Sequence, residues 1–163
     1  MTREFSFSKL SVPRKKPEAV TAGSKILISG GELKKLDASD MLGGYSSTVD
    51  ILDVSNMKWT TANLSIARQY FGAASATPNL AVFAGGFYND IRLSSVDIYD
   101  AETDSWSLGK SLSHNRSNLA ASTVENRYRF YHTFFLPKVP QFFISQVLCV
   151  RQRQHRCSRQ ACI

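Results

Sequence analysis

An internal repeat is the feature that most constrains the fold of this chain. The segment VDILDVSNMKW at 49–59 returns as VDIYDAETDSW at 96–106, which is 47 residues later. Upstream, ILISGG at 26–31 returns as AVFAGG at 81–86, and a longer connection in the first copy explains the larger spacing of 55 residues. A repeat of this length predicts stacked supersecondary units, each of which buries its apolar face on its neighbours.

Apolar residues inside each copy follow the periodicity of β-strands. A short apolar run such as 80–84 ends at a glycine pair, which is typical of a strand buried on both faces. The run at 95–100 alternates between apolar and polar residues, the period of a half-buried strand. We therefore expect an all-β chain without a helix over 17–126. Each unit should hold four short antiparallel strands, in the second unit 70–76, 80–84, 95–100 and 105–108.

The two copies share one order of features, which is a glycine pair, a strand ending in Asp, a lone Trp and an Arg that opens the next copy. These residues are Gly30, Gly31, Asp53, Trp59 and Arg68, and then Gly85, Gly86, Asp100, Trp106 and Arg116. This order resembles the kelch repeat, over about 110 of the 163 residues. The resemblance implies β-propeller blades, each a four-stranded antiparallel sheet, arranged around a central channel.

The repeat divides the chain into five parts. We expect a disordered lead-in at 1–18, a first blade at 19–66, a second blade at 67–115, the first strand of a third blade at 116–126 and a non-kelch tail at 127–163. Propellers typically close with about four to eight blades. The chain should therefore form an incomplete kelch-type propeller of about two to three blades with an irregular tail. It would be part of a larger parent, or copies would complete the ring by self-association.

The net charge of +7 lies wholly in the tail. Residues 1–126 carry 13 basic and 13 acidic side chains, whereas 127–163 carry seven basic ones and no acid. We interpret the tail as the product of a retained intron or a frameshift, whose aromatic stretches form adventitious strands or aggregate. The alternative is a tail that binds nucleic acid or an anionic membrane. It is disfavoured because Pro137 and Pro140 interrupt any regular amphipathic period.

The repeated motif residues are interpreted as scaffold. A glycine pair allows positive φ and close approach of a neighbouring chain segment. A Trp on an outer strand should cover apolar area between adjacent sheets, and its truncation should cost about 3–5 kcal/mol. For Arg68 and Arg116 two alternatives stay open. Each lies flat against the Trp ring, or each pairs with Asp53 or Asp100.

No catalytic or metal-binding constellation stands out. Asp50 and Asp53 recur at the same spacing as Asp97 and Asp100, which indicates turn and strand-end roles rather than an acid–base pair. The H-x-C-x4-C pattern that starts at His155 lacks the paired cysteine spacing of a structural zinc site. We therefore expect no enzyme activity, no metal and no cofactor. The competing class is a fragment of a galactose-oxidase-like kelch enzyme, which would contain copper.

The resemblance implies a protein-interaction module with its specificity in the loops between strands. The connections 32–48 and 87–95 both follow the second strand of their unit, so they should emerge on the same face. Aromatic and Arg side chains on adjacent exposed loops suit a protein partner, although plain solvated turns are the alternative. The candidate partner-binding residues are Tyr45, Phe87, Tyr88, Asn89, Asp90 and Arg92.

Targeting signals do not stand out in the sequence. The first sixteen residues lack the apolar core of a signal peptide. No uninterrupted apolar stretch reaches the length of about 18 residues that a membrane-spanning helix needs. By default, we expect a cytoplasmic protein.

Overall fold

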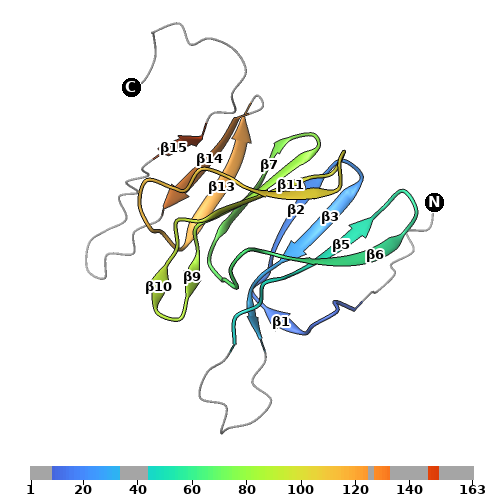
Figure 1. Ribbon diagram of the computed structural model, residues 1–163, viewed down its shortest axis with the longest axis horizontal. Helices are drawn as coiled ribbons and strands as arrows, with labels where there is room; N and C mark the ends of the chain where they lie inside the picture. The colour runs from blue at the N-terminus through green and yellow to red at the C-terminus, as the bar shows by residue number, and fades with distance from the viewer. Residues whose placement is uncertain (1–8, 34–43, 125–126, 133–146, 151–163) are drawn as a thin grey trace, which may run out of the picture.

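The computed structural model describes residues 9–33, 44–124, 127–132 and 147–150. All regular elements in these ranges are strands, and none is a helix. Figure 1 shows three sheets placed side by side, which we call the first, second and third sheet in chain order.

The first and second sheets each contain four antiparallel strands in sequential order. The first sheet consists of β2 (Glu18–Ala22), β3 (Lys25–Ser29), β5 (Thr48–Asp53) and β6 (Lys58–Asn63). The second sheet consists of β7 (Gly72–Thr77), β8 (Leu80–Ala84), β11 (Val96–Asp100) and β12 (Ser105–Leu108). The expectation of an all-β chain with four-stranded antiparallel units is confirmed.

Strand pairing places the repeated residues at equivalent positions. In the first sheet Leu52 lies opposite Trp59, and in the second sheet Tyr99 lies opposite Trp106. The glycine pairs lie directly after β3 and β8, where each chain leaves the sheet. The sequence repeat is therefore also a repeat of register.

The third sheet has three described strands, which are β13 (Leu119–Val124), β14 (Arg127–His132) and β15 (Val147–Val150). The tail was expected to be irregular, yet it supplies β14 and β15 to this sheet. Tyr and Phe favour strands, and the Arg-Tyr-Arg-Phe-Tyr-His run of β14 pairs along the whole of β13. The rest of the tail, 133–146 and 151–163, lies outside the described residues.

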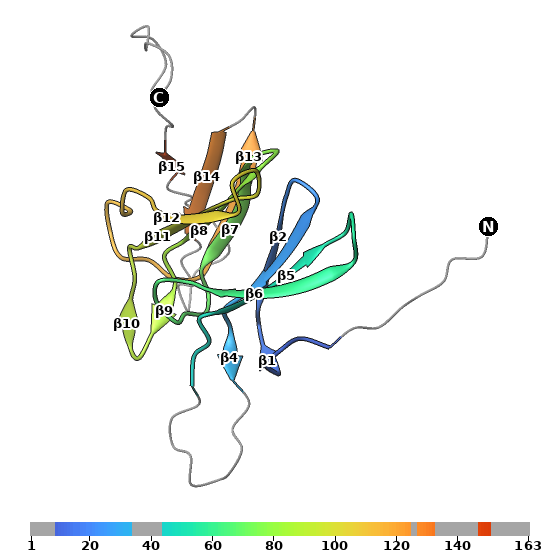
Figure 2. The same cartoon turned by 45° about the vertical axis from the view of Figure 1, so that its right-hand side comes forward.

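Two short pairs of strands lie at one end of the sheets. The strand β1 (Arg14–Lys15) pairs with β4 (Glu32–Leu33), and β9 (Phe87–Tyr88) pairs with β10 (Ile91–Arg92) in a hairpin. Figure 2 shows all four strands at the same end of the molecule, and we call this end the loop face.

Part of the segment that was expected to be a disordered lead-in contacts the first sheet instead. Residues 9–17 are described, and the side chain of Arg14 is fully buried against that sheet. The physical reason is a partner for the charge, because Arg14 forms an ion pair with Asp50. Residues 1–8 lie outside the described residues.

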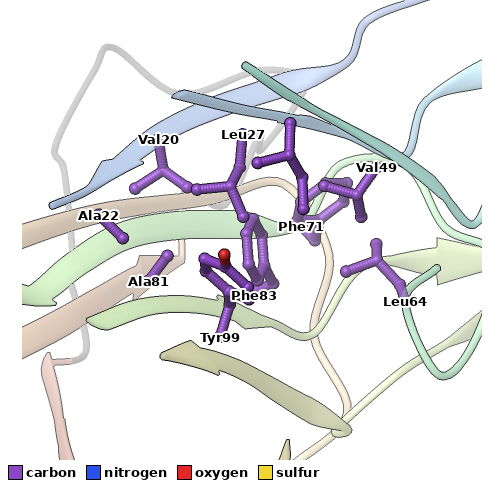
Figure 3. Packing of buried hydrophobic residues seen from close by; sticks show 10 residues of the cluster. Val20, Ala22, Leu27, Val49, Leu64, Phe71, Ala81, Phe83 and Tyr99 are labelled. Carbon is purple, nitrogen blue, oxygen red and sulfur yellow. The ribbon is translucent and has the colours of Figure 1, made fainter. Parts of the chain in front are cut away.

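Buried apolar side chains fill the spaces between neighbouring sheets. One cluster lies between the first and second sheets, where Phe71 and Phe83 meet side chains such as Leu27 and Val49 (Figure 3). A second cluster lies between the second sheet and β13, with Val82 and Leu112 among its members. The second sheet is therefore covered on both faces, as an inner member of a stack should be.

Candidate functional site

The glycine pairs join each four-stranded sheet to the one that follows. The φ angles are +61° at Gly30 and +100° at Gly31, and the second pair repeats them at +67° and +108°. The Gly31 amide donates to the Arg68 carbonyl at 2.8 Å, and the Gly86 amide donates to the Arg116 carbonyl at 2.7 Å. The glycines therefore hold the loop-face ends of adjacent sheets together.

The Arg68 side chain is buried at this junction and makes several hydrogen bonds. Its guanidinium donates to the Asp97 carboxylate at 2.6 Å and to the carbonyls of Gly85 and Ser95, each at 3.1 Å. Burial lowers the pKa of Arg68, and the nearby Asp97 carboxylate opposes that shift. The residue orders the start of the second sheet and both ends of the connection 85–95.

Both sequence-based alternatives for Arg68 are wrong, because its partner is Asp97. Asp97 and Asp100 are three residues apart in one strand, so their side chains point to opposite faces of the sheet. Asp97 lies toward the loop-face end, where Arg68 enters. Asp53 and Asp100 have the turn roles expected of them, since each accepts a backbone N–H two residues later, from Ser55 and Glu102 respectively.

The buried side chain of Arg14 is a feature that the sequence reasoning missed. It donates to Asp50 at 2.6 Å, and the Ser11 amide donates to the same carboxylate at 3.0 Å. The second sheet repeats this arrangement, because the Ser65 amide donates to Asp97 at 3.0 Å. The signal that could have found Arg14 is the pattern Leu-Ser-x-x-Arg, which occurs at 10–14, 64–68 and 112–116.

The structure brings three of the candidate partner-binding side chains together on the loop face. The Tyr45 ring lies edge-on to Tyr88, with 5.6 Å between centroids, and edge-on to Phe87 at 6.3 Å. We call Tyr45, Phe87 and Tyr88 the aromatic cluster. Reciprocal backbone hydrogen bonds of 2.8 and 3.1 Å between Phe87 and Gln69 hold the cluster against the start of the second sheet.

Asn89 and Asp90 form the tip of the β9–β10 hairpin. Their φ angles of +48° and +65° are those of a tight hairpin turn, which Asn and Asp tolerate better than other side chains. Both residues are exposed. They therefore form the turn of the hairpin that carries Phe87 and Tyr88.

Exposed side chains surround the aromatic cluster. Arg92 lies opposite Phe87 in the hairpin and is exposed. Tyr88 is 40% exposed, and its cross-strand partner Ile91 is 58% exposed. Ile91 is a further apolar surface residue that was not among the sequence candidates, although it occupies the same loop.

A polar network joins the first and second sheets at the end opposite the loop face. Lys25 donates at 2.8 Å both to the Tyr99 hydroxyl and to the Asp104 carboxylate. The hydrogen bond to Asp104 raises the pKa of Lys25, and the hydrogen bond from Lys25 lowers the pKa of Asp104. We call Lys25, Tyr99 and Asp104 the polar latch.

Among the described residues there is neither a candidate metal site nor a candidate membrane-spanning helix. The described part of the chain contains no group of three His, Cys, Asp or Glu side chains that could hold a metal ion. The pattern that starts at His155 lies outside the described residues. Within the described ranges, no helix is long and apolar enough to cross a membrane.

Similarity to known proteins agrees with the repeat. Residues 72–113 match the family model of the Kelch motif. This range contains Gly85, Gly86, Asp100 and Trp106, so the kelch resemblance is confirmed there. An F-box/kelch-repeat protein of Arabidopsis thaliana is 28% identical over 123 residues, which are 73% of this chain and 33% of that relative. The chain thus spans about a third of the length of that curated relative.

Proposed function

We propose that this kelch-repeat chain is a non-catalytic protein-interaction module that binds its partner through the loop face. The observation that carries the proposal is the aromatic cluster, in which Tyr45 from the first sheet's connection meets Phe87 and Tyr88 from the second. Two loops that are distant in sequence thereby form one surface. The described part of the chain offers no comparable group of exposed or half-exposed aromatic rings.

The composition of this surface suits a protein partner. Tyr and Arg are enriched among residues that dominate binding energy, because they combine apolar area with a polar tip. Tyr88 and Arg92 are exposed at neighbouring positions of the hairpin, with Ile91 beside them. The tight turn and the bonds to Gln69 fix the hairpin in advance, which reduces the entropy lost on binding.

The family context supports the same class of function. Kelch repeats generally serve as protein-interaction modules, and the Arabidopsis relative combines kelch repeats with an F-box by its name. We propose that the identity of the partner is set by the hairpin and by the connection that contains Tyr45.

Affinity capture with matched variants tests the proposal. The double variant Tyr88→Ala/Arg92→Ala should lose its specific partners, with binding weakened at least about tenfold, since the loss of about 1.4 kcal/mol has that effect. The control Glu102→Ala/Thr103→Ala changes exposed residues in the β11–β12 turn at the opposite end and should retain them. Unchanged capture by the Tyr88→Ala/Arg92→Ala protein would refute binding through the loop face.

The metal content of the purified chain tests the non-catalytic part separately. A protein-interaction module should contain no stoichiometric copper. Copper bound at one ion per chain would favour the galactose-oxidase-like alternative, whatever the capture experiment shows.

A further inference from the structure

The first sheet has one apolar face that no other described sheet covers. Strand register places Ile26 opposite Leu52 and Leu52 opposite Trp59, so these side chains share one face. Ile28 lies on the same face, two residues along β3 from Ile26. We call Ile26, Ile28, Leu52 and Trp59 the outer face. In Figure 1 the first sheet lies at one end of the row of three sheets.

The second sheet shows what such a face requires. The residues equivalent to the outer face are Ala81, Phe83, Tyr99 and Trp106. The first three are 0% exposed, and the Trp106 ring stacks on Phe83 at 5.6 Å between centroids. Here the first sheet supplies the cover. On the outer face Trp59 is 37% exposed, and the other three side chains are only half-buried. The two sheets have the same register, but this face is covered in the second sheet and open in the first.

The chemistry of the outer face differs from that of its counterpart. The second sheet meets Lys25 of its neighbour with the Tyr99 hydroxyl and the Asp104 carboxylate. The equivalent positions in the first sheet are Leu52 and Met57, and Met57 is 65% exposed. A neighbouring sheet that carried a lysine at this point would bury the ammonium against apolar side chains, which is costly. The outer face is therefore unsuited to a neighbour built like the first sheet.

The one charged strand residue on the same side of the sheet as the outer face already has an ion-pair partner. Asp50 points to this side of the sheet, but it is buried and paired with Arg14 at 2.6 Å. No other charged side chain of β2, β3, β5 or β6 shares the face, according to the strand register. A surface that docks here should therefore bring no unpaired charge of its own. The outer face of a second copy meets this condition, because it is apolar.

We propose that a second copy of this chain docks on the outer face through its own outer face, about a two-fold axis. Two-fold dimers are the commonest symmetric assemblies, and their interface uses the same patch on both copies. In this arrangement Trp59 and Leu52 of each copy cover those of the other. The surface is separate from the aromatic cluster, so this proposal and the proposed partner binding fail or stand independently.

Sedimentation velocity of the full chain over a wide range of concentration tests the dimer. The wild-type chain should reversibly form a dimer, and Trp59→Glu should weaken its association at least about tenfold by burying an uncompensated charge. The control is Leu108→Glu, which changes another exposed apolar residue on the outermost strand of its sheet and should leave association unchanged. Circular dichroism establishes that each variant is folded. A wild-type chain that is monomeric at every concentration overturns the proposal.

Cross-linking of single-cysteine variants tests the symmetry. In a chain whose Cys149, Cys157 and Cys162 are replaced by Ser, Thr61→Cys places a thiol on the side of Trp59, and Thr60→Cys places one on the opposite side of the same strand. A short bis-maleimide should join two copies at position 61 and not at position 60. Association without linkage at position 61, or growth into assemblies larger than a dimer, would indicate head-to-tail packing and overturn the two-fold arrangement.

Discussion

Arg68 and Asp97 form a buried ion pair of 2.6 Å in the second sheet, and Arg14 and Asp50 repeat it at 2.6 Å in the first. In both sheets a serine amide completes the carboxylate's hydrogen bonding. Each arginine precedes the first strand of its sheet, and each aspartate lies in the third strand. The pair therefore connects the entry of a sheet to its middle.

Replacing Arg68 by Met should strongly destabilise the chain. The substitution retains apolar bulk but leaves the buried Asp97 carboxylate without its cation, which typically costs about 3–5 kcal/mol. Urea denaturation should show this decrease in the free energy of unfolding. The exposed Arg92→Met should change it by less than about 0.5 kcal/mol. Equal effects of the two substitutions would show that the ion pair does not stabilise the sheet.

Alanine at Gly30 should cost more than alanine at Gly23. The two glycines have similar φ angles, +61° and +57°, so the backbone strain of about 1–2 kcal/mol is common to both. A Cβ at Gly30 would lie 2.5 Å from the Phe71 ring and 2.7 Å from the Arg68 carbonyl, whereas at Gly23 the nearest atoms are 3.4 Å away. Thermal unfolding of both variants separates the clash from the strain. A melting temperature as low for Gly23→Ala as for Gly30→Ala would contradict the clash.

The two equivalent tryptophans should differ in their contribution to stability. Trp106 packs on Phe83 and on Tyr99, with 5.1 Å between the latter ring centroids, so Trp106→Ala should cost about 3–5 kcal/mol. Trp59 is 37% exposed and should cost about 1 kcal/mol or less when it is truncated in dilute solution. Chemical denaturation at low protein concentration measures both values. A large loss for Trp59→Ala under these conditions would place its ring in a contact within the chain.

The sequence allowed the strands and their grouping into four-stranded units to be predicted, because alternation of apolar residues and repeated turns are local signals. It could not give the partner of Arg68, since the choice between Asp97 and Asp100 depends on which face and which end of the strand each occupies. The equivalence of Trp59 and Trp106 was visible in the repeat, but their burial was not. Burial depends on a neighbouring sheet, and only Trp106 has one among the described residues.

For the candidate loop residues, too, the sequence predicted one feature and could not predict another. Their common face followed from the position of both connections after a second strand. The contact of Tyr45 with Phe87 and Tyr88 did not, because the distance between two loops depends on how adjacent sheets pack. The roles of these residues in partner binding stay predictions, to be tested by the variants proposed above.

The Asp50 carboxylate should make the stability of the chain sensitive to acid. Burial alone would raise the pKa of Asp50, but the hydrogen bonds from Ser11 and the Arg14 guanidinium outweigh it and lower the pKa below its ordinary value. A carboxyl whose pKa is lower in the folded state stabilises the fold above its unfolded pKa of about 3.9 and loses this contribution as the pH falls through the folded value. The free energy of unfolding should therefore decrease below about pH 4, and Asp50→Asn should flatten this part of the profile.

Urea denaturation at a series of pH values measures that profile. Asp50→Asn also leaves Arg14 without its ion-pair partner, so the slope against pH, rather than the absolute stability, carries the test. Thr60→Val changes an exposed uncharged residue in the same sheet and should keep the wild-type slope. An Asp50→Asn protein with the wild-type slope would mean that the acid sensitivity arises from other carboxylates, such as Asp104 of the polar latch, whose pKa is also lowered by its hydrogen bond from Lys25.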